Sequence, residues 1–114
     1  MEFHPVSYIF PLMTDSEFDA LVNDIHKNGQ FEPIWTYQGK IIDGRNRYRA
    51  CEKLGIKPHF REWDGKGSLV SFVVSMNLHR RHLTPGQAAC VAVETLPLLE
   101  EEAKRRQLST LKQG

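Results

Sequence analysis

The residues that could do chemistry gather in residues 41–50, Ile-Ile-Asp-Gly-Arg-Asn-Arg-Tyr-Arg-Ala. Two β-branched residues are followed by Asp43-Gly44 and then by three arginines and an asparagine. This order predicts a strand that turns through Gly44 into an arginine-rich helix. A helix N-terminus offers backbone N–H groups and the positive end of its dipole to an anion. Because arginine adds charge-assisted hydrogen bonds to phosphate oxygens, the stretch favours anion binding.

The charges of the chain are unevenly distributed, although the formal net charge is only +1. Residues 1–39 contain one lysine and no arginine against six acids, and residues 40–61 contain seven basic residues against two acids. The remaining residues are nearly balanced, with seven basic residues and six acids. This distribution favours a local anionic ligand near residues 41–50 and does not support a uniformly basic surface for nucleic acid.

A second basic cluster occupies residues 77–82, Asn-Leu-His-Arg-Arg-His. Asn77 could coordinate Mg²⁺ or a phosphate oxygen, or it could cap the end of a helix. Arg80 could bind phosphate. His79 and His82 have the spacing of a metal pair, but no third ligand is evident, so phosphate or DNA contact is favoured. Two basic clusters at helix junctions could converge on one polyphosphate.

Two carboxylates are candidates for a catalytic base. Asp43 could act as a general base or an Mg²⁺ ligand, but a role as a turn residue is slightly favoured. Glu32 stands just before the first expected hairpin strand, and an exposed loop acid is the favoured interpretation. The order of serine, histidine, cysteine and aspartate residues does not indicate nucleophilic catalysis.

The elements that must position these residues can be predicted from hydrophobic spacing and turn residues. Thr14 and Glu17 form a capping box, Gly55 ends the helix that contains the arginines, and Ser68 is a candidate helix cap. Pro97 is expected to kink or end the last helix. The sequence predicts an α+β fold in which a small mixed sheet with a hairpin is packed by helices and followed by a C-terminal helical extension. The predicted strands are 6–10, 33–37, 40–42 and 57–63, and the predicted helices begin near residues 15, 45, 69 and 85, the third being interrupted at residue 77.

Within the predicted helix at 45–54, the residues divide into two faces. Ala50, Cys51 and Leu54 form the buried face, and Arg47 lies at the N-terminal end of the same face. A buried arginine needs an anionic partner, so Arg47 is expected to point inward. The opposite face carries Arg45, Arg49 and Lys53, for which a solvated surface and a ligand or partner role are equally favoured.

The remaining composition suggests a cytoplasmic protein. The two cysteines lack metal-type spacing, which favours reduced residues in a reducing compartment. No apolar run reaches the length of a membrane span, and the N-terminus lacks the layout of a signal peptide. The final residues show no clear end, so we expect the sequence to continue in a longer protein.

Three motifs in this order resemble the N-terminal domain of the ParB family of plasmid and chromosome partition proteins, which shares its fold with sulfiredoxin. Residues 44–50, Gly-Arg-Asn-Arg-Tyr-Arg-Ala, resemble the family's Gly-Glu-Arg-Arg-Tyr-Arg-Ala. Residues 76–80, Met-Asn-Leu-His-Arg, resemble Glu-Asn-Leu-Gln-Arg, and a Leu-Thr-Pro helix start follows at 83–85. Residues 28–34 resemble the family's Gly-x-x-x-Pro-Ile segment. The resemblance spans residues 5–95.

The resemblance implies a CTP-binding domain in which the nucleotide and Mg²⁺ govern the closure of a homodimer on DNA. Residues 1–83 would form the nucleotide-binding domain, and residues 84–114 a helical connector to a DNA-binding region beyond Gly114. The phosphates would lie on Gly44, Arg45, Asn46 and Arg47, and the second motif would complete the site with Asn77, His79 and Arg80, Asn77 also holding Mg²⁺. Candidates for DNA or partner contact are Arg49, Lys53, Arg81 and His82.

Departures from the family pattern leave the activity open. Arg45, Asn46 and Met76 replace the family's Glu, Arg and Glu, the last of which is tied to Mg²⁺ and hydrolysis, so we expect at most a weak NTPase. The base could be cytosine or adenine, because relatives on this fold use ATP. One alternative is an ATP-using small-molecule kinase with Glu32 or Asp43 as its base; others are a ParB-like nuclease and a DNA adaptor without nucleotide. Sulfiredoxin activity is disfavoured because its reactive cysteine falls at Arg45.

Overall fold

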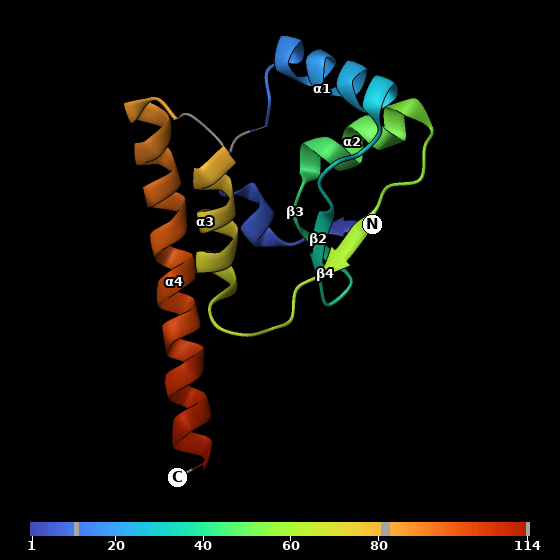
Figure 1. The fold of residues 1–114 in the computed structure, drawn as a ribbon. Helices are drawn as coiled ribbons and strands as arrows, with labels where there is room; N and C mark the ends of the chain where they lie inside the picture. The colour runs from blue at the N-terminus through green and yellow to red at the C-terminus, as the bar shows by residue number, and fades with distance from the viewer. Residues whose placement is uncertain (11, 81–82, 114) are drawn as a thin grey trace. The chain divides into compact units, whose positions relative to one another are not determined.

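The computed structural model describes residues 1–10, 12–80 and 83–113, with the exception of the side chains of residues 79, 80 and 109–113. The chain forms two compact units, Met1–Gly65 and Lys66–Gly114 (Figure 1). The boundary between the two units therefore lies after Gly65. The assignment of residues 1–83 to nucleotide binding and of residues 84–114 to a connector stays a prediction.

The first unit is built on a mixed sheet of four strands in the order β1-β3-β2-β4. The strands are β1 (Glu2–Phe3), β2 (Ile34–Tyr37), β3 (Lys40–Asp43) and β4 (Phe60–Glu62). β2 and β3 form the predicted antiparallel hairpin, whereas β1 pairs with β3 and β4 pairs with β2 in parallel. β4 is shorter than the predicted strand 57–63. The hairpin is central, and it ends at Asp43, directly before the arginine-rich helix.

The predicted strand at residues 6–10 is wrong. Pro5–Tyr8 instead forms a 3₁₀ helix, η1. Pro5 supplies a φ that suits the start of a helix, and the Nδ1 atom of His4 accepts a hydrogen bond from the backbone N–H of Val6 at 3.0 Å. Ser7 adds a bond from its hydroxyl to the carbonyl oxygen of His4 at 2.7 Å. These local contacts outweigh the β-branched and aromatic composition of the segment.

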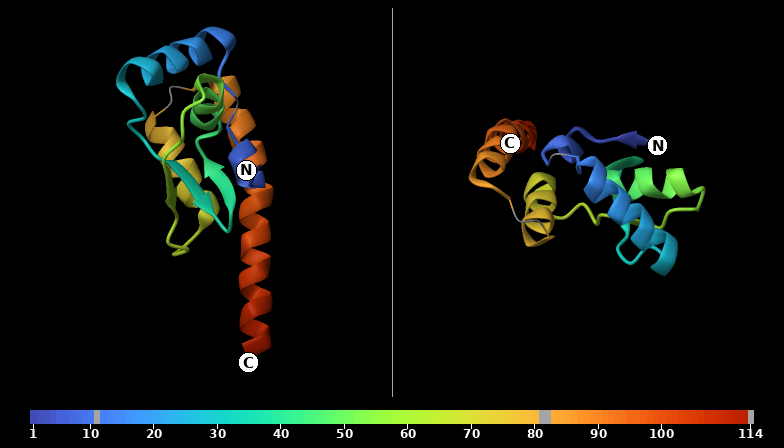
Figure 2. Two further views of the ribbon diagram at one scale, coloured as in Figure 1. Left: turned by 90° about the vertical axis from the view of Figure 1, so that its right-hand side faces the viewer. Right: turned by 90° about the horizontal axis from the view of Figure 1, so that it is seen from above.

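Two helices, α1 (Asp15–Asn28) and α2 (Arg45–Leu54), pack on each other (Figure 2). The predicted capping box begins α1, and α2 ends at Gly55, as the sequence indicated. Their contact contains the buried side chains Val22 and Ile25 from α1 and Ala50 and Cys51 from α2. Leu54 packs against the same cluster, which confirms the predicted buried face of α2.

The second unit consists of α3 (Leu69–Arg80) and α4 (Pro85–Gln113). Ser68 caps α3, because its hydroxyl oxygen accepts from the N–H of Ser71 at 3.1 Å. Glu102 of α4 reinforces this end: its carboxylate accepts from the Ser68 hydroxyl at 2.6 Å and from the Leu69 N–H at 3.1 Å. A carboxylate at a helix N-terminus also interacts favourably with the helix dipole. The hydrogen bonds from Ser68 and Leu69 to Glu102 therefore link the start of α3 to α4.

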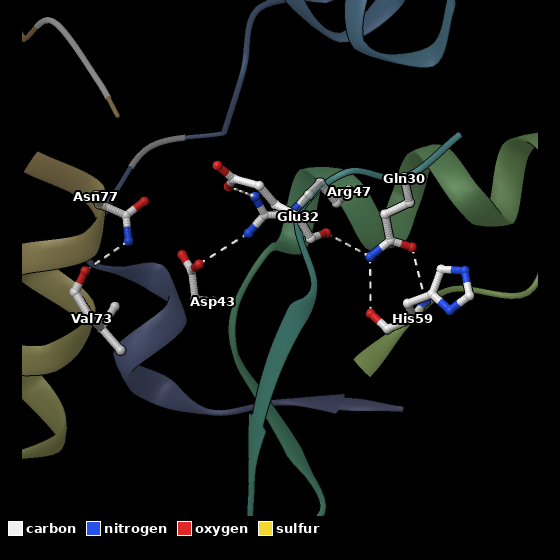
Figure 3. A network of polar contacts seen from close by, with 7 residues as sticks. All are labelled: Gln30, Glu32, Asp43, Arg47, His59, Val73 and Asn77. Atoms are coloured by element: carbon white, nitrogen blue, oxygen red, sulfur yellow. Dashed lines mark hydrogen bonds and ion pairs between the residues drawn. The ribbon is translucent and has the colours of Figure 1, made fainter. Parts of the chain in front are cut away.

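Two predictions about these helices need correction. The interruption expected at Asn77 does not occur, because α3 continues to Arg80. Asn77 is buried, and its amide donates to the carbonyl oxygen of Val73 at 2.8 Å, so the polar side chain is accommodated inside the helix (Figure 3). Of the two outcomes expected for Pro97, a kink or the end of the helix, the end is wrong, because α4 extends to Gln113.

The fold is therefore α+β, with a small mixed sheet, a central hairpin, covering helices and a long C-terminal helix, as predicted. Among the residues that the structure describes, no helix has both the length and the apolar character needed to cross a membrane.

Candidate functional site at the start of α2

The start of α2 has the geometry that the sequence predicted. Gly44 is the N-cap residue and adopts a left-handed conformation with φ 105° and ψ 29°, and no side chain caps this end of the helix. A Cβ atom at Gly44 would lie 3.1 Å from Nη2 of Arg47 and 3.3 Å from the Cα atom of Ile34. Glycine is thus required by the backbone conformation and by the guanidinium that lies beside it.

Arg47 points inward and contacts two carboxylates (Figure 3). Its Nη1 atom lies 2.8 Å from Oε2 of Glu32, and its Nη2 atom lies 3.0 Å from Oδ2 of Asp43. The side chains of Arg47 and Asp43 are 14% and 6% exposed, whereas that of Glu32 is 53% exposed. The predicted anionic partner of Arg47 is therefore present, and the protein itself supplies it.

These contacts revise the interpretation of the two acids. Asp43 is the last residue of β3 and buried, so it is more than a turn residue. Glu32 is an exposed loop acid, as favoured, but it also forms an ion pair with Arg47. Together, the side chains of Arg47, Glu32 and Asp43 carry a formal charge of −1. This net negative charge would repel an anion that approaches this end of α2. A polyphosphate would need a cation beside it to offset the repulsion of the carboxylates.

The two carboxylates on Arg47 are of the ligand type that Mg²⁺ takes in proteins. Mg²⁺ is commonly held by one or two carboxylates plus the phosphate oxygens of a substrate, and it keeps several waters. Glu32 and Asp43 supply two such carboxylates next to a helix N-terminus. Within the described part of the chain, no group of three or more histidine, cysteine, aspartate or glutamate residues is placed to hold a metal ion.

Arg45 and Asn46 hold the preceding segment against α2. A guanidinium nitrogen of Arg45 donates to the carbonyl oxygen of Phe10 at 2.6 Å, and the guanidinium lies 4.7 Å from the centre of the Tyr8 ring. The side-chain oxygen of Asn46, a buried residue, accepts from the N–H of Met13 at 3.3 Å. Both side chains therefore have packing partners, and their part in phosphate binding stays a prediction.

Arg49 and Lys53 are exposed on the outward face of α2, as expected. The Arg49 guanidinium lies 5.0 Å and the Lys53 ammonium 5.7 Å from the centre of the Phe18 ring. Lys53 also lies 3.9 Å from a carboxylate oxygen of Asp19, and both of these side chains are mostly exposed. The acids of α1 thus offset part of the positive charge on this face. Contact of Arg49 and Lys53 with DNA stays a prediction.

The second basic cluster belongs to the other unit. Asn77 lies inside α3, so the alternative in which it caps a helix end is wrong. The side chains of His79 and Arg80, and the residues Arg81 and His82 as a whole, lie outside the described part of the structure. The convergence of the two clusters on one ligand, and the role of Asn77 in holding Mg²⁺, stay predictions.

Gln30 is a residue that the sequence did not single out. Its amide nitrogen donates to the carbonyl oxygens of Glu32 at 2.8 Å and His59 at 2.9 Å (Figure 3). Its amide oxygen accepts from the N–H of His59 at 2.9 Å and from the thiol of Cys51 at 3.6 Å. Gln30 therefore fixes the segment that carries Glu32 onto His59, which directly precedes β4, and onto Cys51 of α2. No short-range spacing in the sequence indicates this role, since Cys51 and His59 lie 21 and 29 residues away along the chain.

Cys51 lies beneath the same segment. Burial raises the pKa of its thiol, and the nearby positive charge of Arg47 partly offsets this effect. Desolvation is the larger influence, so the pKa of the thiol lies above its ordinary value. This environment fits a packing residue and differs from the electropositive, accessible setting of reactive cysteines.

Comparisons with protein-family models, with curated proteins and with solved structures find no match to this chain. The resemblance to the ParB family accordingly stays an inference from the three motifs and their order.

Proposed function

We propose that the chain is a ParB-like nucleotide-binding domain of a DNA-partition or DNA-regulatory protein, and that it binds the triphosphate of CTP or ATP at the start of α2. The observation that carries the proposal is the position of the Arg47 guanidinium against Gly44, at a helix end that no side chain caps. Helix N-termini of this kind bind phosphate through backbone N–H groups and the helix dipole. The Arg47 guanidinium, which Glu32 and Asp43 hold beside Gly44, adds positive charge at the same place.

The proposal includes Mg²⁺ as a second ligand of the site, because two carboxylates contact Arg47 there. Glu32 and Asp43 would hold the ion, which supplies positive charge between the carboxylates and the phosphates. Arg47, fixed by both acids, would keep its orientation as the nucleotide enters. We therefore expect nucleotide binding to depend on Mg²⁺ more strongly than it would at a purely cationic site.

The biological role follows from the motif resemblance. In this proposal the nucleotide controls the association of two copies of the domain on DNA, in the cytoplasm, with at most weak hydrolysis. Arg49 and Lys53 on the outward face of α2 are the described candidates for DNA contact, together with Arg81 and His82. Such contact to the phosphate backbone would be salt-sensitive and nearly independent of DNA sequence.

A second candidate function is favoured by the placement of two carboxylates on one guanidinium. An ATP-using small-molecule kinase needs a base near the terminal phosphate, and Glu32, with its exposed carboxylate, could accept the proton of a hydroxyl group of the acceptor. ATP consumption that requires a small hydroxylated acceptor such as serine would favour this function over the nucleotide switch.

Calorimetric titration with CTP, ATP and ADP, each with and without Mg²⁺, tests the proposal. Binding is expected with Mg²⁺ and is expected to weaken greatly in Arg47→Lys, which keeps one charge but loses the bidentate geometry. Arg49→Lys, on the outward face of the same helix, is the matched control and should bind normally. Nucleotide affinity that is equal in the two variants would contradict the proposal, as would the absence of binding to the wild-type chain.

A further inference from the structure

Phe31 is the most exposed large hydrophobic side chain among the described residues, at 77%. Single exposed apolar residues are common on protein surfaces, so exposure alone carries no functional meaning. Phe31 differs in its location. It lies between Gln30, which is bonded to His59 directly before β4, and Glu32, which contacts Arg47 at the start of α2.

The segment that carries Phe31 is anchored on both sides. Gln30 bonds to both backbone groups of His59 and to the carbonyl oxygen of Glu32, so the backbone on either side of Phe31 is bridged. Glu32 is held by its ion pair at 2.8 Å. Because Gln30 and Glu32 are both tied to the unit, Phe31 presents its ring to solvent from a fixed backbone position. An anchored aromatic ring costs less conformational entropy when it binds a ligand than a ring on a mobile loop.

Phe31 also directly precedes Glu32, whose carboxylate contacts Arg47 at the proposed phosphate site. Consecutive Cα atoms are about 3.8 Å apart, so the backbone of Phe31 lies one residue from a side chain that contacts Arg47. A nucleotide whose phosphates lie at the start of α2 extends its base away from them. The base needs an apolar or aromatic surface, and Phe31 is an exposed aromatic residue one position before Glu32 in the chain.

We propose that Phe31 is the stacking surface for the nucleobase of the bound nucleotide. This inference rests on the proposed function and adds how the base is recognised. Stacking on an aromatic ring tolerates every base, because each base has a π face. The contact therefore accommodates both CTP and ATP and recognises the class of nucleoside triphosphates without selecting one base.

The test compares nucleotides with inorganic tripolyphosphate, which has the phosphates but no base. In the presence of Mg²⁺, Phe31→Ala is expected to weaken the binding of ATP and CTP by about 5- to 150-fold. The affinity for tripolyphosphate is expected to stay unchanged. Phe31→Trp, which keeps an aromatic face, should restore nucleotide affinity, whereas Phe31→Leu should not. Ile56→Ala is the matched control, because Ile56 is exposed and follows Gly55 at the opposite end of α2.

The outcomes separate this inference from the function on which it rests. If ATP and tripolyphosphate bind, and binding depends on Arg47, but Phe31→Ala leaves the ratio of their affinities unchanged, then the stacking inference is wrong and the phosphate site stands. If neither ATP, CTP nor tripolyphosphate binds the wild-type chain, both fail. A drop in tripolyphosphate affinity equal to that in ATP affinity would also overturn the inference, since the role of Phe31 would then be structural.

Discussion

Replacing Arg47 with methionine should destabilise the first unit strongly, because the change removes one guanidinium from two carboxylates. In the ion pair with Glu32, the carboxylate is about half exposed. Exposed ion pairs contribute about 0–1 kcal/mol to the free energy of unfolding. The arm to Asp43 is different, since both side chains are largely buried. Breaking a buried pair by removing one partner costs about 3–5 kcal/mol. The expected total is therefore about 3–5 kcal/mol, most of it from the buried carboxylate.

Urea unfolding followed by tryptophan fluorescence measures this effect on the correct unit. Both tryptophans, Trp35 and Trp63, belong to Met1–Gly65, so their fluorescence reports on that unit. With an m value of about 2 kcal/mol/M, the expected loss shifts the midpoint by about 2 M. Glu32→Gln should cost about 1 kcal/mol or less, since it removes only the exposed arm.

Two further variants decide whether the buried charge causes the loss. Asp43→Asn combined with Arg47→Met should recover part of the stability, because the buried carboxylate that lost its ion pair is then neutral. Arg49→Met is the control for removing an arginine from the same helix, and it should change stability little because Arg49 is exposed. The reasoning is refuted if Arg47→Met costs less than about 1 kcal/mol, or no more than Glu32→Gln.

Two other predictions concern neighbouring positions. Gly44→Ala should destabilise the unit by more than about 1 kcal/mol, because alanine is strained at φ 105° and its Cβ atom would crowd Arg47. Gly39→Ala, at φ 78° with no atom near the added Cβ, should cost less stability in the same urea assay. A larger loss of stability in Gly39→Ala than in Gly44→Ala would argue against the crowding at Gly44. In a Cys90→Ser background, the thiolate absorbance of Cys51 should appear at a higher pH in the folded protein than in urea, because burial raises the pKa of the thiol. Arg47→Met should raise the pKa of the thiol in the folded protein further, since Arg47 lowers that pKa.

Local signals in the sequence predicted much of the fold. The Thr14 capping box and Gly55 mark helix ends through contacts within a few residues, and the two-residue turn between the strands predicted at 33–37 and 40–42 sets the hairpin. The inward position of Arg47 followed from its spacing relative to Ala50 and Cys51. Such features depend on 3.6-residue and two-residue periodicity, which the sequence displays directly.

The errors came from places where a specific contact outweighs composition. The segment after His4 has strand-like residues, but Pro5 and the His4 side chain favour a 3₁₀ turn. Asn77 looked like a break, yet its amide bonds to the helix backbone one turn earlier. The partners of Arg47 could not be predicted fully either: Asp43 lies four residues away, but Glu32 lies fifteen residues away in a separate loop. Only the pairing of the hairpin and α2 brings Glu32 to the guanidinium.

The central claim, that the start of α2 binds the triphosphate of a nucleotide, can be tested by recording backbone amide resonances during titration with ATP and Mg²⁺. The amides of Gly44, Arg45, Asn46 and Arg47 are predicted to shift together and to saturate with one affinity, whereas adenosine with Mg²⁺ should shift none of them. A saturating shift confined to other parts of the chain, or no shift at millimolar ATP, would contradict the account.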